Sequence, residues 1–163
     1  MPYQRFEDLP VWNSAIDLAL RIYEFTSKPQ FTGRYSLKDQ IERAAVSVSN
    51  NIAEGFERGT NKELLSFLYI ARGSAGEVRS MLCLIERIAA FQELGKETKL
   101  LKSKAESCSR QLKAWAQALQ NSDFNGERHV SQKMKRAAEA AKERQDFLNE
   151  LAEIRAKSAS KNN

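Results

Sequence analysis

Two glutamates, Glu54 and Glu77, come nearest to a catalytic pattern in this chain, because carboxylates on facing helices hold paired metal ions in some helical bundles. Such sites also need Glu-x-x-His pairs. The only histidine, His129, lies beyond the first 121 residues, so no His-based triad or His-rich metal site can form within them. With no Gly-x-Ser-x-Gly motif either, the sequence predicts no enzyme activity, no metal site and no cofactor.

A run of small residues from Gly73 to Gly76 could be mistaken for a phosphate-binding loop. A phosphate loop follows a β-strand and ends in a lysine motif, whereas this run lies inside a helical apolar repeat with no predicted strand before it. Small side chains also let two helices approach closely. We therefore interpret the run as a helix-packing segment.

The segment 40–63 combines a regular apolar stripe with polar residues in the middle of a predicted helix. Serine and asparagine compete for backbone hydrogen bonds, and glycine costs about 1 kcal/mol relative to alanine inside a helix. Two explanations stay open: small residues admit a neighbouring helix, which we favour, or the polar residues form a functional site. The residues concerned are Ser47, Ser49, Asn50, Asn51 and Gly55.

Charged residues of the same region suggest further polar contacts. Asp39 with Arg43, and Glu54 with Arg58, have the i,i+4 spacing of ion pairs within one helix. We also predict that Glu54 or Glu77 pairs with Arg43 or Arg72 across helices. The candidate structural polar cluster is Arg43, Asn51, Glu54, Arg72 and Glu77.

Apolar residues at helical spacing predict helices over residues 9–26, 37–58, 61–91 and 98–120. Ser36 is the predicted start signal of the second helix, Gly59 ends it, and a capping box from Thr60 to Glu63 begins the third. Leu94 and Gly95 are predicted to end the third helix. Four amphipathic helices with short connections favour an all-α, antiparallel up-down-up-down four-helix bundle.

The chain after residue 121 differs from the bundle. A linker precedes a charged, alanine-rich segment with a narrow apolar stripe, and residues 158–163 are predicted to be a disordered tail. We assign residues 1–121 to the bundle and 122–163 to a linker, an amphipathic C-terminal helical extension and the tail. The extension buries too little to stand alone, so it docks, pairs with another chain or frays.

Composition points to a cytoplasmic protein that is not in the membrane. Cys83 and Cys108 lie in apolar helical patterns and are predicted to be reduced thiols, and no window resembles a leader or a membrane span. Some apolar residues lie off the main stripes, which predicts a second buried surface and hence a homo-oligomer. These residues are Leu18, Phe25, Leu65, Ile70 and Met81.

Basic residues outnumber acidic ones, 26 against 21, for a net charge of +5. This mild excess is compatible with an acidic partner such as nucleic acid. An up-down-up-down bundle brings three candidate residues to one end: Arg5, Arg58 and Lys62. The densest basic run in the chain is Lys133, Lys135 and Arg136. The candidate nucleic-acid-binding residues are Arg5, Arg58, Lys62, Lys133, Lys135 and Arg136.

Several motifs occur in order over about residues 5–120: Phe6-Glu-Asp-Leu9, Val11-Trp12 and Ala15, then Gln40, Arg43-Ala-Ala-Val-Ser47, Asn51-Ile-Ala-Glu-Gly55 and Arg58, then Phe67-Leu68, Ala71-Arg-Gly-Ser74 and Glu77. With them the chain resembles the four-helix-bundle proteins encoded in intervening sequences of bacterial large-subunit ribosomal RNA genes. That resemblance implies a ring-like homopentamer with no established enzymatic activity. The fold is also similar to that of the accessory proteins of diversity-generating retroelements, which associate with reverse transcriptase and nucleic acid.

Together these observations predict a non-enzymatic homo-oligomer, pentameric by resemblance, that binds structured RNA or DNA or a nucleic-acid enzyme such as a reverse transcriptase. The alternative is a structural scaffold for protein partners without nucleic-acid binding. The sequence contains no motif that reads base edges, so shape and charge would drive any binding.

Overall fold

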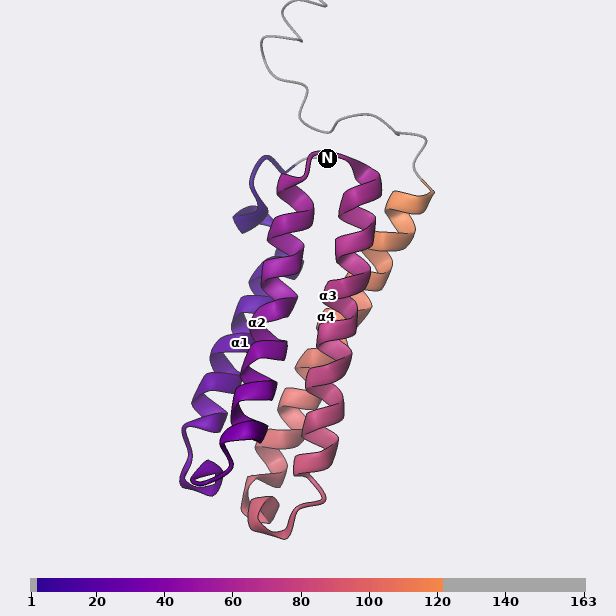
Figure 1. Cartoon of the computed structure of the whole chain (residues 1–163). Helices are drawn as coiled ribbons and strands as arrows, with labels where there is room; N and C mark the ends of the chain where they lie inside the picture. Colours follow the sequence, from indigo (N-terminus) through magenta and orange to yellow (C-terminus); the bar gives the residue numbers. More distant parts are fainter. Residues whose placement is uncertain (1–2, 122–163) are drawn as a thin grey trace, which may run out of the picture. The chain divides into compact units, whose positions relative to one another are not determined.

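The computed structural model describes residues 3–121, which form four α-helices and three short 3₁₀ turns without any strand (Figure 1). This confirms the predicted all-α four-helix fold. The predicted extension lies outside the described residues. In chain order the elements are η1 (Phe6–Asp8), α1 (Pro10–Thr26), η2 (Pro29–Phe31), α2 (Tyr35–Glu57), α3 (Asn61–Ile85), η3 (Ala89–Leu94) and α4 (Gly95–Gln120).

Contacts between helices fix their directions. Gln40, near the start of α2, donates a hydrogen bond to Glu77, near the end of α3. At the opposite ends, Gly55 of α2 lies against Leu64 of α3. The two helices therefore run in opposite directions, and Figure 1 shows the same reversal between each consecutive pair.

The connection between α2 and α3 follows the predicted chemistry. Gly59 has a φ of +86°, the left-handed conformation that glycine adopts without a steric penalty. The Thr60 hydroxyl accepts a hydrogen bond from the Glu63 amide at 3.2 Å and donates one to the Glu63 carboxylate at 2.6 Å. The predicted stop and capping box are confirmed.

Two predicted helix ends are wrong. The third helix ends at Ile85 and not at residue 91, and Gly95 begins α4 instead of ending α3. The reason is Phe91, which is 1 % exposed and packs edge-to-face on Phe31. A straight helix continuing past Ile85 would carry this ring beyond the core, so the chain turns through η3 to bury it.

The predicted start of α2 is also displaced. Ser36 lies inside the helix, which begins at Tyr35 after Arg34, a residue whose side chain makes no capping hydrogen bond. Gly33, with a φ of +77°, makes the turn just before it. A glycine turn therefore sets the entry angle of α2, and no serine cap is needed.

The core is wider than the single stripe predicted for each helix. Leu18 and Phe25 are fully buried and Met81 is 7 % exposed, so these residues do not form a second, free surface. Leu65 is half-buried, and Ile70 alone of the five is exposed. A helix in a bundle buries an arc of at least about 100°, which includes positions beside the central stripe.

Gly55 marks the closest approach of α2 and α3. A Cβ atom on Gly55 would lie 2.5 Å from Cβ of Phe67, closer than carbon atoms can pack. The packing explanation for the small residues of α2 therefore holds at this position. It fails for Gly73 and Gly76 of α3, where a β-carbon would meet no heavy atom within 4 Å, so the helix-packing interpretation of that run is wrong for its glycines.

We expect Gly55→Leu to destabilise the protein by about 1–3 kcal/mol or more, because the side chain overpacks the α2–α3 contact. Gly55→Ala should destabilise it as well. Gly73→Ala is the matched control: it should stabilise α3 by up to about 1 kcal/mol, since alanine is the better helix former where space is open. Urea unfolding of the three variants measures these differences, and a Gly55→Leu protein as stable as the wild type would contradict the close contact.

Candidate nucleic-acid interface

Three of the predicted nucleic-acid-binding residues lie at the end of the bundle where α1 and α3 begin and α2 ends (Figure 1): Arg5, Arg58 and Lys62. Arg5 forms an ion pair with Glu7 at 2.7 Å, and Arg58 pairs with Glu54 at 2.6 Å. The Glu7 carboxylate raises the pKa of Arg5 through its hydrogen bond. Lys62 is exposed.

Among the described residues of the segments that carry Arg5, Arg58 and Lys62, acidic residues outnumber basic ones. Arg5, Arg58 and Lys62 stand against five carboxylates from the same segments, so the net local charge is negative. Phosphate would be repelled as much as attracted there. The five are Glu7, Asp8, Glu54, Glu57 and Glu63.

The other three candidates, Lys133, Lys135 and Arg136, lie outside the described residues. Their role in binding stays a prediction.

Helix α4 carries the largest excess of basic residues, with six Lys or Arg against two Glu. Lys102 and Lys104 point to neighbouring segments, where they pair with Glu86 and Asp17, each at 2.7 Å. The remaining four, which are all exposed, form the α4 basic face: Lys96, Lys99, Arg110 and Lys113.

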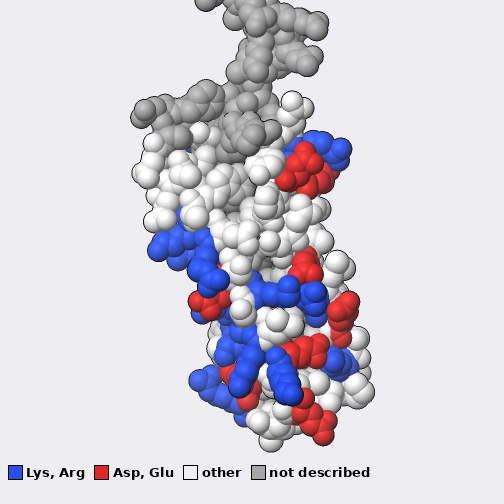
Figure 2. Space-filling model, turned by 180° about the vertical axis from the view of Figure 1, so that it is seen from behind, with Lys and Arg blue, Asp and Glu red and all other residues white. Residues whose placement is uncertain are grey.

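Within residues 3–121, Lys96, Lys99 and Lys113 form no ion pair, while Arg110 pairs with Glu106 at 3.3 Å. Spacings of three and fourteen residues keep such side chains on one side of a helix. Figure 2, seen from behind, shows Lys and Arg gathered over the lower part of this side of the bundle, with fewer Asp and Glu between them. This is the most basic helix surface in the described part of the chain.

Sequence reasoning missed the α4 basic face although a signal was present. The four cations lie opposite the buried stripe of the same helix, which includes Leu101, Ala105 and Leu112. These cations form no dense run in the sequence, and they are spread along α4 instead of gathering at one end of the bundle. A helical wheel of residues 95–120 places the four cations away from the buried stripe, but it also places Lys102 beside Lys113.

Within residues 3–121, the structure contains none of the predicted cross-helix ion pairs of the polar cluster. Arg43 pairs with Asp39 of its own helix at 3.2 Å. Glu54 likewise pairs within the same segment, with Arg58, and Arg72 forms no hydrogen bond or ion pair with residues 3–121. A partner one turn away on the same helix is held in place by the backbone, which makes these local pairs easier to form. The i,i+4 pairs predicted from spacing are confirmed.

Besides the Gln40–Glu77 hydrogen bond, uncharged polar groups join α2 to α3. The Asn51 amide donates to the Ser47 carbonyl at 2.7 Å, and the hydroxyls of Ser47 and Ser74 lie 3.0 Å apart. The mid-helix polar residues of α2 thus satisfy one another across a half-buried contact. No titratable group takes part in these bonds of Asn51, Ser47 and Ser74.

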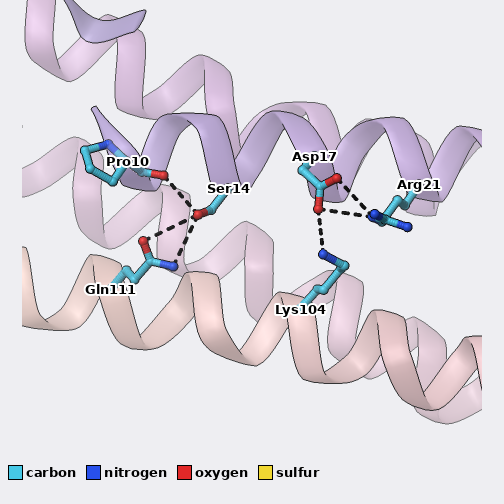
Figure 3. Close-up of polar contacts among 6 residues, drawn as sticks. All are labelled: Pro10, Ser14, Asp17, Arg21, Lys104 and Gln111. Carbon is cyan, nitrogen blue, oxygen red and sulfur yellow. Dashed lines mark hydrogen bonds and ion pairs between the residues drawn. The ribbon is translucent and has the colours of Figure 1, made fainter. Parts of the chain in front are cut away.

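A second polar contact joins α1 to α4 (Figure 3). Asp17 accepts hydrogen bonds from Lys104 at 2.7 Å and from Arg21 at 3.0 Å. Farther along α4 from Lys104, Gln111 donates a hydrogen bond to the Ser14 hydroxyl of α1 at 3.3 Å. The hydrogen bond from Lys104 is the main reason that the pKa of Asp17 lies below its ordinary value. These bonds accompany the rotation of α4 that its buried apolar stripe requires, and they direct Lys104 toward α1.

Little else in the described residues suggests catalysis. Burial raises the pKa of the Cys108 thiol to about 11, so this thiol stays protonated and unreactive at neutral pH. Within residues 3–121 no three His, Cys, Asp or Glu residues lie close enough to hold a metal ion, and none of the helices there could cross a membrane. A surface pocket is lined by uncharged residues: Ser36, Leu37, Gln40, Ser80, Met81, Leu84 and Ile88.

The fold defines a class: small all-α proteins built of four helices. A search of curated proteins found no match to the chain. Residues 7–114 match the family model described as 23S rRNA-intervening sequence protein. The chain belongs to that family, as its motifs indicated.

We expect Asp17→Asn to lower stability most at neutral pH. An aspartate whose pKa is depressed by folding stabilises the fold above its unfolded pKa of about 4, and this contribution is lost as the pH falls through the folded pKa. The difference in unfolding free energy between wild type and Asp17→Asn should therefore shrink below about pH 4. Thermal melts from pH 7 to pH 2.5 measure it. Asp39→Asn is the control, because it removes only an exposed pair and should have a smaller effect.

Proposed function

We propose that the protein is a non-enzymatic, homo-oligomeric module that binds structured RNA or DNA through the α4 basic face. The observation that supports this most is the division of the basic residues of α4. Lys102 and Lys104 are used to hold neighbouring segments, whereas Lys96, Lys99 and Lys113 form no ion pair within residues 3–121. Exposed lysines without partners are the groups that bind phosphate with release of counterions.

Recognition of this kind would depend on charge and shape. Lysine and arginine on one helix surface can follow a phosphate backbone, but nothing in the α4 basic face is arranged to read base edges. We therefore expect similar affinity for unrelated sequences of the same nucleic-acid structure.

Assembly would strengthen weak contacts. The family resemblance implies a ring-like pentamer, and exposed apolar side chains such as Leu20 (59 % exposed) and Tyr23 (48 %) support a contact between copies. Copies of one basic face on a ring would bind a long phosphate backbone together, which raises the overall affinity without new contacts.

A scaffold for protein partners is the second candidate function. It is favoured by apolar side chains on other parts of the surface, since Ile70, Leu84 and Leu100 are each 51 % exposed. A nucleic-acid enzyme could be such a partner. This function requires no binding of free RNA or DNA.

Gel shift and fluorescence anisotropy on structured RNA and duplex DNA test the first proposal. We expect wild-type affinity to fall steeply from about 50 to 200 mM salt, and Lys96→Glu/Lys99→Glu to weaken binding at every salt concentration. On duplex DNA, the slope of log K against log salt should decrease by about 0.9 for each phosphate that the variant no longer neutralises.

Two full-length variants serve as matched controls. Arg58→Glu/Lys62→Glu changes the same number of charges at the end of the bundle where acidic residues prevail, and it should bind nearly as well as the wild type. Lys133→Glu/Lys135→Glu/Arg136→Glu tests the C-terminal segment. Loss of binding in either control, with Lys96→Glu/Lys99→Glu unaffected, would move the site away from α4. No binding by the wild type at low salt would favour the scaffold.

A further inference from the structure

Helix α1 exposes apolar side chains that its own bundle does not cover. Ile16 is half-buried, and Leu20 and Tyr23 are among the most exposed large apolar residues of the described chain. Spacings of four and three residues place the three on one side of the helix, which we call the α1 strip. Ser14 and Asp17 face α4 and Thr26 faces α2, so the α1 strip lies on the outer side of α1.

Helix α3 carries a strip of different character. Its members recur at spacings of four and three residues, which places them on one side of the helix. Two of them, Arg72 and Arg79, form no ion pair or hydrogen bond within residues 3–121. Tyr69 is 44 % exposed, and the space beside Gly76 is open, with no heavy atom within 4 Å of a β-carbon there. The α3 strip consists of Leu65, Tyr69, Arg72, Gly76 and Arg79.

The α1 strip is itself uncharged but has an acidic neighbour, whereas the α3 strip contains two arginines. Glu24, one turn after Leu20, is exposed and its carboxylate forms no ion pair with residues 3–121. Helices α1 and α2 together carry three Lys or Arg and six Asp or Glu, a net charge of −3. Helices α3 and α4 carry nine and four, a net charge of +5. An apolar strip on the acidic half thus matches a strip with two free arginines on the basic half.

From this complementarity we infer that the α1 strip of one copy docks on the α3 strip of the next copy. Leu20 and Tyr23 enter the open space beside Gly76 and stack on Tyr69, while Glu24 pairs with one of the two arginines. Two α1 strips would bring Glu24 against its own copy, and two α3 strips would oppose arginines, so pairing like with like is disfavoured.

The position of the strips allows each copy to use both at once. Helices α1 and α3 lie on a diagonal of the bundle, each between α2 and α4 (Figure 1). A contact between two different surfaces repeats from copy to copy and generates a ring when the rotation closes. This inference rests on the homo-oligomer proposed above, and it names the surfaces that build it. The cations Lys96 and Lys99 of the α4 basic face lie outside both strips.

Two blocked variants of the full-length chain test the docking by light scattering. In Leu20→Arg/Tyr23→Arg the α1 strip becomes cationic and meets the arginines of α3. In Arg72→Glu/Arg79→Glu the α3 strip becomes anionic and meets Glu24. Each variant alone should have the mass of one chain, 18.5 kDa, at concentrations where the wild type is oligomeric. Mixed, they should form at least a 1:1 complex, because each still has one intact strip.

Ile70→Arg/Leu84→Arg is the matched control, since it places the same charges at equally apolar and exposed positions outside both strips. It should assemble like the wild type, and circular dichroism should show that all variants keep their helices. An oligomeric Leu20→Arg/Tyr23→Arg protein would overturn the docking, and so would a mixture of the two blocked variants that stays at the mass of one chain. A monomeric wild type would instead refute the proposed homo-oligomer itself.

Discussion

The contact between Gly55 of α2 and Phe67 of α3 is the constraint on which most of this bundle depends. It leaves no room for a β-carbon and so holds the two helices at close range near their shared turn. The short connection through Gly59 and Thr60 is possible only because the helices are already that close. At the same range, Ser47 and Ser74 can bond directly across the interface. The glycine at position 55 therefore permits the close approach that accompanies both the short turn and the Ser47–Ser74 contact.

In the other half of the bundle, ion pairs accompany the apolar packing of α4. Asp17 binds Lys104 of α4, and Glu86, just after the end of α3, binds Lys102, so lysines on two sides of α4 hold it against its two neighbours. Such partly exposed pairs contribute little free energy, and they agree with the rotation that the buried apolar stripe of α4 requires. That rotation leaves the remaining basic side chains of α4 facing solvent.

This arrangement leaves the described residues with surfaces of different character. Polar groups between helices bind one another, and the buried Cys108 thiol is held protonated. Charge is unevenly distributed among the helices: α1 and α2 carry a net acidic charge, and α3 and α4 a net basic one. A small bundle with this asymmetry can contact a copy of itself and a polyanion with different sides.

The sequence by itself determined the helical class, the turn at Gly59 and Thr60, and the local ion pair between Asp39 and Arg43, because periodicity, capping and i,i+4 spacing act over a few residues. Only the tertiary structure decided that α3 ends at Ile85, where the chain turns to bury Phe91. It also decided which lysines of α4 face solvent. Those outcomes depend on the distance and rotation between helices, and residues far apart in the chain fix both.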